Sequence, residues 1–348
     1  MARRSVTERL DAFQRRHTWA NIPLAVIYKF ADDQGGYLAA LITYYGFLSV
    51  FPLLLLLTSI LGVVLRSNPH LQDQILESVL SQFPVIGNQL GDPRALGGGV
   101  TAIVIGSLTA IYGGLGVAQA TQHAMNQIWD VPRNRRPNPL VARLRGLLLL
   151  LIGGVALLGA TVLSAMGSGS RSFDRGIGQI AISGLLIVAS VLVNAGVFLL
   201  AFRVSTAHER LTLRAAVPGA ITAALLWQLL QLFGAQYVAR VVQVASISNS
   251  VSAVVLGLVA FLYLSAVALV VSMQVNVVLA KKLYPRALLA PFTDAVDLTQ
   301  GDQDAYTDAA KAEQQKGFQT VDVSFENEGQ NASASERATP ERSDQTKG

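Results

Sequence analysis

The sequence predicts an all-α membrane protein, a polytopic helical bundle with about six transmembrane helices. Hydrophobic residues make up 51% of the 348 residues and charged residues only 14%, whereas about a quarter of the residues in soluble domains are charged. A helix that crosses the hydrocarbon layer needs about 20 apolar residues. The uncharged windows of that length are residues 37–65, 97–118, 146–166, 180–202, 215–234 and 251–280.

The positions of the charged residues agree with these windows and indicate an orientation. All 27 Lys and Arg and all 22 Asp and Glu lie outside them, as expected because an ionised side chain at the bilayer centre costs a few kcal/mol. Of the 27 basic residues, 22 fall in alternate connections that include both terminal segments. Because basic loops stay in the cytoplasm, we expect a cell inner-membrane protein with both termini on the cytoplasmic side.

Three segments flank the predicted membrane domain, which spans residues 37–280. Residues 1–36 combine arginines with spaced apolar residues, which is typical of a basic amphipathic arm on the membrane surface, and an ordinary solvated arm is the alternative. Residues 281–290 form a basic juxtamembrane segment. Residues 291–348 contain 12 acidic and five basic residues with almost no apolar periodicity, which predicts a disordered acidic cytoplasmic tail.

The charge distribution indicates the partners of the protein. Without the tail, which carries a net charge of −7, the remaining chain has a net charge of +12. A basic cytoplasmic face attracts anionic lipids. A basic surface alone would also attract nucleic acid, but lipid is the expected partner and no nucleic acid is expected. A homo-oligomer stays open.

The sequence lacks the residue patterns of common enzymes and cofactor sites. It contains no cysteine, and its four histidines are scattered without metal-ligand spacing. No glycine-rich loop precedes a Lys and a Ser or Thr, and no carboxylate lies within the predicted spans, as serine catalysis would need. We therefore expect neither an enzyme nor a bound cofactor or metal.

Neutral polar residues on the predicted spans are the candidates for a transport path. Gln119, Gln122, His123 and Asn126 share one helical face, because they are spaced at i, i+3, i+4 and i+7. Polar side chains in a bilayer face protein or water, so these four could line a hydrophilic pocket with further residues. The further candidates are Asn194, Gln228, Gln231, Gln274 and Asn276. The alternative is that all nine only form hydrogen bonds between helices.

An aromatic and basic cluster follows the second predicted span. Trp129 is suited to the headgroup layer, and arginine side chains bind phosphate in a bidentate way. The candidate contacts to a lipid headgroup are Trp129, Arg133, Arg135 and Arg136. A signal that only keeps this loop in the cytoplasm explains the cluster equally well.

Small residues at four-residue spacing predict close packing between spans. Ala216, Ala220 and Ala224 form one such row, with Gly219 and Ala223 beside it. In lipid, helices associate through close approach of their backbones, so this row predicts a compact bundle.

Four sequence runs, in this order and at this spacing, resemble the YihY/BrkB family of bacterial inner-membrane proteins, also called virulence factor BrkB-like. The resemblance covers most of residues 20–285. The runs are Ala39 to Pro52 (AALITYYGFLSVFP), Asn126-Gln127-Ile128-Trp129, Pro218-Gly219-Ala220 with Trp227, and Met273-Gln274-Val275-Asn276. Ser272 and Gln274 stand where the family has glycine and glutamate, so a role of that carboxylate does not carry over.

The resemblance implies a six-span protein whose biochemical activity is poorly defined. Family members have been linked to serum resistance and to the export of envelope lipids, and some carry a ribonuclease label. The absence of a metal or acid–base site in the sequence argues against that label. The first hypothesis is therefore a transporter or lipid-translocating protein with unknown substrate. The second is a scaffold that recruits partners through its acidic tail and basic loop, and the third is a membrane-bound hydrolase.

Overall fold

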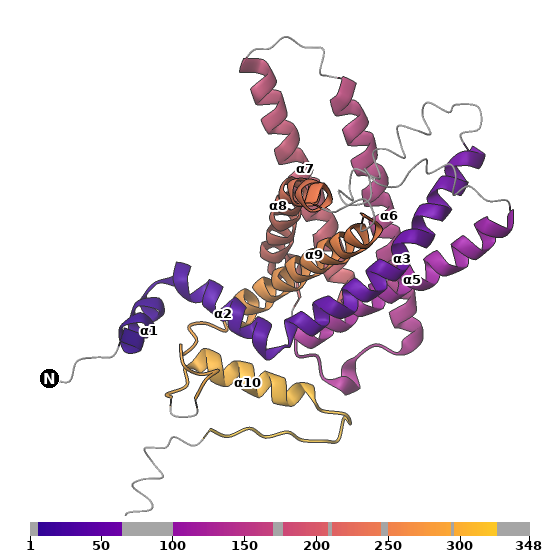
Figure 1. Ribbon diagram of the computed structural model, residues 1–348. Coiled ribbons are helices and arrows are strands. Elements are labelled where there is room, and N and C mark those ends of the chain that lie inside the picture. The colour runs from indigo at the N-terminus through magenta and orange to yellow at the C-terminus, as the bar shows by residue number, and fades with distance from the viewer. Residues whose placement is uncertain are drawn as a thin grey trace, which may run out of the picture.

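The computed structural model describes residues 6–64, 100–169, 177–207, 211–244, 250–293 and 296–325, and all regular secondary structure in these ranges is helical. Each of six long helices overlaps one of the six predicted windows, and α5, α6 and α8 extend up to ten residues beyond it (Figure 1). They are α3 (Gly35–Val64), α5 (Val100–Ile128), α6 (Pro139–Gly169), α7 (Ile177–Ser205), α8 (Leu213–Val244) and α9 (Ser250–Lys281). The all-α prediction is therefore confirmed.

Four stretches in these helices are long and apolar enough to cross a membrane. They are Pro139–Ala156, Ile187–Ser205, Leu213–Gly234 and Val255–Lys281, and Gly35–Val50 forms a shorter apolar stretch. These stretches confirm a helical membrane protein. The number of six spans and the cytoplasmic position of the termini stay predictions.

Most charged residues in the described part of the chain gather at one end of the bundle. Because consecutive long helices run in opposite directions, α3, α6 and α8 begin at this end and α5, α7 and α9 end there. We call it the charged end. Figure 1 shows α10 (Gln300–Ala312) lying across it, below α9 and α2.

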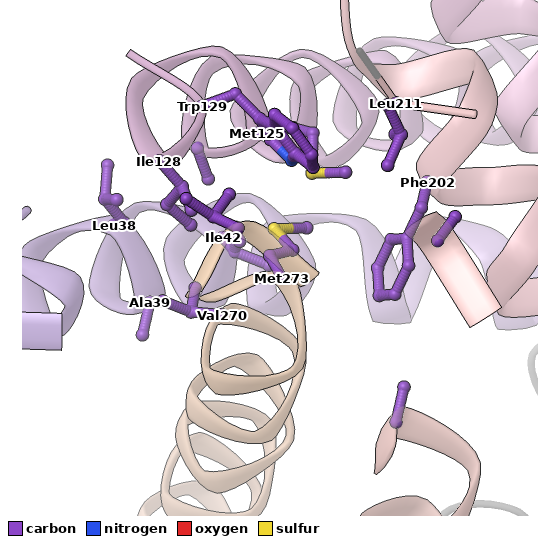
Figure 2. Packing of buried hydrophobic residues seen from close by; sticks show 14 of the residues in the cluster. Leu38, Ala39, Ile42, Met125, Ile128, Trp129, Phe202, Leu211, Val270 and Met273 are labelled. Atoms are coloured by element: carbon purple, nitrogen blue, oxygen red, sulfur yellow. The ribbon is translucent and has the colours of Figure 1, made fainter. Parts of the chain in front are cut away.

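The hydrophobic core lies just inside the charged end. Figure 2 shows Trp129 and Met125 of the α5 region facing Met273 of α9 and Ile42 of α3, with Phe202 of α7 close by. All but Ile42 are 0% exposed, and Ile42 is 7% exposed. In contrast, the outer surfaces of α6, α7 and α8 carry many exposed leucines and valines, as helices surrounded by lipid require.

The predicted row of small residues on α8 packs inside the bundle. Ala216, Ala220 and Ala224 are buried, and the backbone of Gly219 touches α9. A Cβ atom at Gly219 would overlap the carbonyl oxygen of Ser272 and lie 2.5 Å from Cγ of Asn276. This is the close backbone approach that small residues permit between membrane helices.

The N-terminal arm forms two helices, α1 (Val6–Arg16) and α2 (Thr18–Asp32). The apolar side of α2 packs against α9, because Ala25 and Val26 form a buried cluster with Val278. On α2, Trp19 and Ile27 are exposed. Part of the face that was predicted to lie on lipid therefore contacts protein instead.

The prediction of disorder for residues 291–348 is wrong for the part that forms α10. Thr299 caps this helix with a capping box, in which Thr299 and Asp302 each accept a backbone hydrogen bond from the other. Ala305 belongs to the buried core. Composition alone does not predict these tertiary contacts. The segment is held in place by ion pairs as well as by apolar burial, and ion pairs with distant residues leave no sign in the local sequence. Residues 326–348 lie outside the described residues.

Candidate functional site

The four polar residues predicted on one face of α5 point in two directions. Gln122 and Asn126 are buried, whereas Gln119 and His123 are exposed. Gln122 Nε2 donates to the carbonyl oxygen of Ala142 in α6 at 3.1 Å. Asn126 Oδ1 accepts a hydrogen bond of 3.0 Å from the backbone N–H of Ala207. The buried pair thus connects α5 to its neighbours.

The two polar residues near the end of α9 also form contacts between helices. Asn276 Oδ1 accepts a hydrogen bond of 2.7 Å from the backbone N–H of Gly219 in α8. Gln274 Nε2 lies 3.3 Å from the carbonyl oxygen of Lys29 and 3.4 Å from Asp33 Oδ2. Both side chains are 0% exposed.

The remaining candidates, Asn194, Gln228 and Gln231, are half-buried on α7 and α8. None of the nine polar candidates lines the apolar cavity described next. In the part of the chain that the structure describes, the bonds of Gln122, Asn126, Gln274 and Asn276 fit helix-to-helix contacts, the alternative reading of this group.

A cavity of about 190 Å³ lies among α3, α5, α7, α8 and α9. Its wall is almost entirely apolar. The lining residues are Ile42, Thr43, Gly46, Val117, Phe198, Ala223, Trp227, Leu262, Ser265, Ala266, Ala268 and Leu269.

The two hydroxyl groups of this wall are already bonded within their own helices. Thr43 Oγ1 donates to Ala39 O and Ser265 Oγ donates to Phe261 O, each at 2.8 Å. The cavity therefore offers a water molecule few polar partners, whereas a buried water usually makes about two to four hydrogen bonds.

The position of the cavity can be derived from the helix geometry. Gly46 lies 11 residues from the start of α3, and Leu269 lies 12 residues from the end of α9. At a rise of about 1.5 Å per residue, the cavity is roughly 16–18 Å from the charged end. This depth falls within a hydrocarbon layer about 30 Å thick.

A second constellation, which the sequence did not reveal, is a chain of buried ion pairs at the charged end. Lys29 of α2 donates to Asp33 Oδ1 at 2.7 Å and to both oxygens of Asp130, at 3.0 and 3.1 Å. Lys281 at the end of α9 donates to Asp130 Oδ2 at 3.0 Å and to Asp308 of α10 at 2.9 Å. We call Lys29, Asp33, Asp130, Lys281 and Asp308 the buried ion cluster.

Asp130 adopts a left-handed backbone conformation, which glycine adopts most often. The end of α5 is a Schellman motif, in which Val131 N donates to Asn126 O and Asp130 N to Gln127 O. Asp130 occupies the left-handed position of this motif with a φ of 52°. Lys282 has a φ of 56° after α9, where Leu283 N donates to Val278 O. Asp130 adopts this left-handed conformation, which costs most L-residues about 1–2 kcal/mol, and its carboxylate there pairs with Lys29 and Lys281.

Arg286 joins the N-terminal arm to α10 beside this cluster. Its guanidinium donates to Asp32 at 3.0 Å and also to Asp302. Asp302 also accepts hydrogen bonds from Ala287 N, Thr299 N and Thr299 Oγ1. The Arg286 side chain is 0% exposed, so α10 is attached by a fully desolvated ion pair.

Burial and neighbouring charges shift the pKa values of Asp33 and Lys29. Burial raises the pKa of Asp33, Lys29 lowers it and Asp130 raises it again, so that the pKa is about 7. Burial alone would lower the pKa of Lys29, but Asp33 and Asp130 raise it above its usual value. Lys29 therefore stays charged, while Asp33 changes charge near neutral pH.

The aromatic and basic cluster after α5 is split between the core and the surface. The ring of Trp129 is 0% exposed in the core, so the prediction that it contacts lipid headgroups is wrong. Arg136 donates to Val131 O and to Gln127 Oε1. Arg135 is exposed.

The basic loop and the tail bind each other. The exposed Arg133 pairs with Glu313 at 3.0 Å, and Asn134 N donates to the carbonyl oxygen of Gln314. The cations of this loop also act on a neighbour, because burial, Arg136 and Arg133 together lower the pKa of His123.

Sequence reasoning missed the buried ion cluster because it searched the apolar windows. Lys29, Asp33, Asp130, Lys281 and Asp308 all lie outside those windows, at sequence separations that no local pattern connects. The one available signal was Lys29 and Asp33 at i, i+4, which by itself is typical of an exposed helix pair.

Together, the apolar helices, the lipid-facing leucines and the charged end define an α-helical integral membrane protein. Within this class, the chain belongs to the Virulence factor BrkB family, whose model matches residues 26–294. The match includes the described parts of α3 to α9 and ends before α10. No curated protein and no solved structure matches the chain.

Proposed function

We propose that this protein translocates or holds lipids of the cell envelope, and that the apolar cavity among α3, α5, α7, α8 and α9 binds a hydrocarbon chain. The observation that carries this proposal is the cavity itself, which lies at bilayer depth and has a wall of aliphatic and aromatic side chains. A hydrocarbon chain gains about 25 cal/mol for each Å² of apolar surface that it buries. The proposal assigns no chemical reaction to the chain.

The lining of the cavity favours lipid over a water-soluble solute. A solute site needs convergent polar groups, but both hydroxyls of this wall are bonded to carbonyl oxygens of their own helices. The buried amides of Gln122, Asn126 and Asn276 do not line the cavity, and each forms a hydrogen bond that joins two parts of the bundle.

The helices around the cavity also offer a route from the bilayer. Leu225 and Leu229 flank Trp227 on α8 and are about half exposed, as is Leu264 on α9. Because α8 and α9 expose leucines on one side and line the cavity on the other, the proposed entry of a lipid chain is from the bilayer side of these two helices.

Filling the cavity tests the proposal. A Cβ atom at Gly46 would have only Leu262 Cδ2 nearby, at 4.0 Å, so Gly46→Leu places its side chain in the void. Gly153→Leu is the matched control, because nothing lies within 4 Å of a Cβ atom on that exposed face of α6.

The measurements are the transfer of labelled phospholipid between leaflets of reconstituted vesicles and the lipid retained by the purified protein. We expect Gly46→Leu to bring transfer close to that of protein-free vesicles and to reduce bound lipid, with Gly153→Leu like the parent. Equal transfer and equal bound lipid in both variants would rule out a role of the cavity.

A scaffold is the second candidate, and exposed aromatic residues near α10 favour it. Phe292 is 78% exposed and Phe318 is 89% exposed. Removing residues 313–348 separates the two candidates, because it keeps Asp302 and Asp308 in place. A scaffold would lose partners that depend on this segment, whereas a lipid translocator would keep its rate of transfer.

A further inference from the structure

We propose that the buried ion cluster is a proton-binding site, that the proton is carried by Asp33, and that its binding strengthens the docking of α10 on the charged end. This inference is independent of the proposed function, because none of the residues that it concerns lines the cavity. The reaction is a simple protonation, in which the Asp33 carboxylate takes one proton from water.

The first argument is the number of charges. The cluster contains two cations, Lys29 and Lys281, and three carboxylates, Asp33, Asp130 and Asp308. With all five ionised it carries one negative charge in excess, in surroundings where four of the five side chains are at most 5% exposed. An excess charge in a desolvated site is costly, and one bound proton removes it.

The second argument identifies the carboxylate that takes the proton. Asp130 accepts bonds from both ammonium groups, at 3.0 to 3.1 Å. Asp33 accepts one short bond, from Lys29 to Oδ1, and its Oδ2 has only the long 3.4 Å contact from Gln274. Hydrogen bonds to the charged form are what keep a buried carboxyl ionised, and in the described structure Asp33 has the weaker set.

The third argument is an acceptor without a donor beside Asp33. Gln274 is 0% exposed, and its Oε1 has no hydrogen-bond partner in the part of the chain that the structure describes. Ionised Asp33 has no proton to offer this amide. The protonated acid has an O–H group that can donate to Oε1 once the amide turns this atom, in place of Nε2, toward Asp33 Oδ2. The direction of the raised pKa of Asp33 agrees with these contacts.

In the described part of the chain, the charged groups that act most strongly on Asp33 come from two of the packed elements. Lys29 and Asp32 belong to α2, and Asp130 follows α5. The neighbour from α9 is the uncharged Gln274. Lys281 pairs with Asp130 and with Asp308, and Asp130 shares Lys29 with Asp33.

The link to α10 follows from the same charge count. When Asp33 is protonated, two cations face Asp130 and Asp308, and the cluster with α10 bound is neutral. When Asp33 is ionised, the cluster is neutral only without Asp308. Deprotonation therefore weakens α10 docking, and undocking of α10 must in turn favour deprotonation by the same factor.

The docking of α10 can be followed directly because the chain contains no cysteine. Ala309→Cys on α10 and Leu140→Cys on α6 both introduce exposed thiols for spin labels. The contact between Asn134 and Gln314 places the end of α10 near the start of α6. The distance distribution between the labels reports the docked fraction in lipid nanodiscs.

We expect the ratio of docked to undocked protein to fall by about fivefold when the pH rises from about 5.5 to about 8.5. This factor is at the low end of the range for coupled sites, because Asp308 is 37% exposed. Asp33→Asn should stay docked at both pH values. Asp322→Asn, an exposed carboxylate outside the cluster, should behave as the parent. Distances of the parent that do not change with pH, or a pH response that survives in Asp33→Asn, would overturn the proposal.

Gln274→Glu keeps the test decisive if Asp33→Asn does not fold. It adds a second carboxyl group at the position 3.4 Å from Asp33 Oδ2, and two carboxyls that share a site bind a proton more tightly. The midpoint of α10 release should therefore move to higher pH, by about one unit or more. A midpoint equal to that of the parent would show that Asp33 does not control docking.

Discussion

The close approach of α8 and α9 makes Gly219→Ala a sharp test of the packing. The added methyl group would overlap the carbonyl oxygen of Ser272, a backbone atom that cannot rotate away, and lie 2.5 Å from Cγ of Asn276. The two helices must then separate, which also weakens the 2.7 Å hydrogen bond from Gly219 N to Asn276.

The expected loss of stability in Gly219→Ala follows from three contributions. Overpacking costs about 1–3 kcal/mol and the weakened hydrogen bond about 1 kcal/mol, while alanine gains back about 1 kcal/mol over glycine as a helix former. The net loss of stability is about 1–3 kcal/mol. Gly153→Ala has the same helix-forming gain, but nothing lies within 4 Å of its Cβ atom, so it should be neutral or slightly stabilising.

The assay is the fraction of protein that stays monodisperse after heating in detergent, measured by size-exclusion chromatography. Gly219→Ala should lose monodispersity at a lower temperature than the parent, and Gly153→Ala should not. Adding Asn276→Ala to Gly219→Ala should not restore the parent midpoint, because the Ser272 carbonyl remains. Equal midpoints for Gly219→Ala and Gly153→Ala would refute this description of the α8–α9 contact.

Three further predictions follow from the charged end. Arg286→Ala leaves Asp32 and Asp302 without their buried cation, so we expect a loss of about 3–5 kcal/mol and faster tryptic cleavage within α10, with unchanged cleavage refuting the attachment. Trp129→Ala should cost about 3–5 kcal/mol in thermal unfolding, whereas a headgroup contact would leave stability unchanged. The pKa of Asp33 is raised from 3.8 to about 7, so the stability that its neutral form contributes is complete below about pH 4 and is lost as the pH rises through about 7. Melting temperatures of the parent should fall across this interval more steeply than those of Asp33→Asn, and parallel curves would contradict the assignment.

The family match separates α10 from the rest of the chain. The family model covers residues 26–294, whereas Asp302 and Asp308, which pair with Arg286 and Lys281, lie beyond it. The charged end of the membrane domain is thus closed by a segment outside the matched residues.

Much of the fold was predictable from the sequence because the lipid environment imposes two simple constraints. Backbone polar groups in hydrocarbon must be bonded within a helix, and ionised side chains are excluded there. Six uncharged windows therefore overlap α3, α5, α6, α7, α8 and α9. The row around Gly219 also predicted close packing correctly, since small residues act through local spacing.

The candidate site was less predictable, because its parts depend on which residues meet across long separations. The sequence placed Trp129 at the headgroups by residue type, but the end of α5 turns its ring into the core. It grouped nine polar residues by their position in the spans, but the helix orientations distribute the buried ones among separate contacts. The apolar cavity could not be predicted from the sequence, because its lining residues are of the same types as the other apolar residues of the helices.

The sequence by itself determined the helical membrane fold, the gathering of charge at alternate connections and the family. Only the tertiary structure decided that Lys29, Asp130 and Lys281 meet in one buried cluster, and that part of an acidic tail forms α10 and closes over it. The physical reason is the separation along the chain over which each effect acts. Helix formation and exclusion from hydrocarbon depend on neighbouring residues, whereas an ion pair between residues 101 apart depends on how the whole bundle packs.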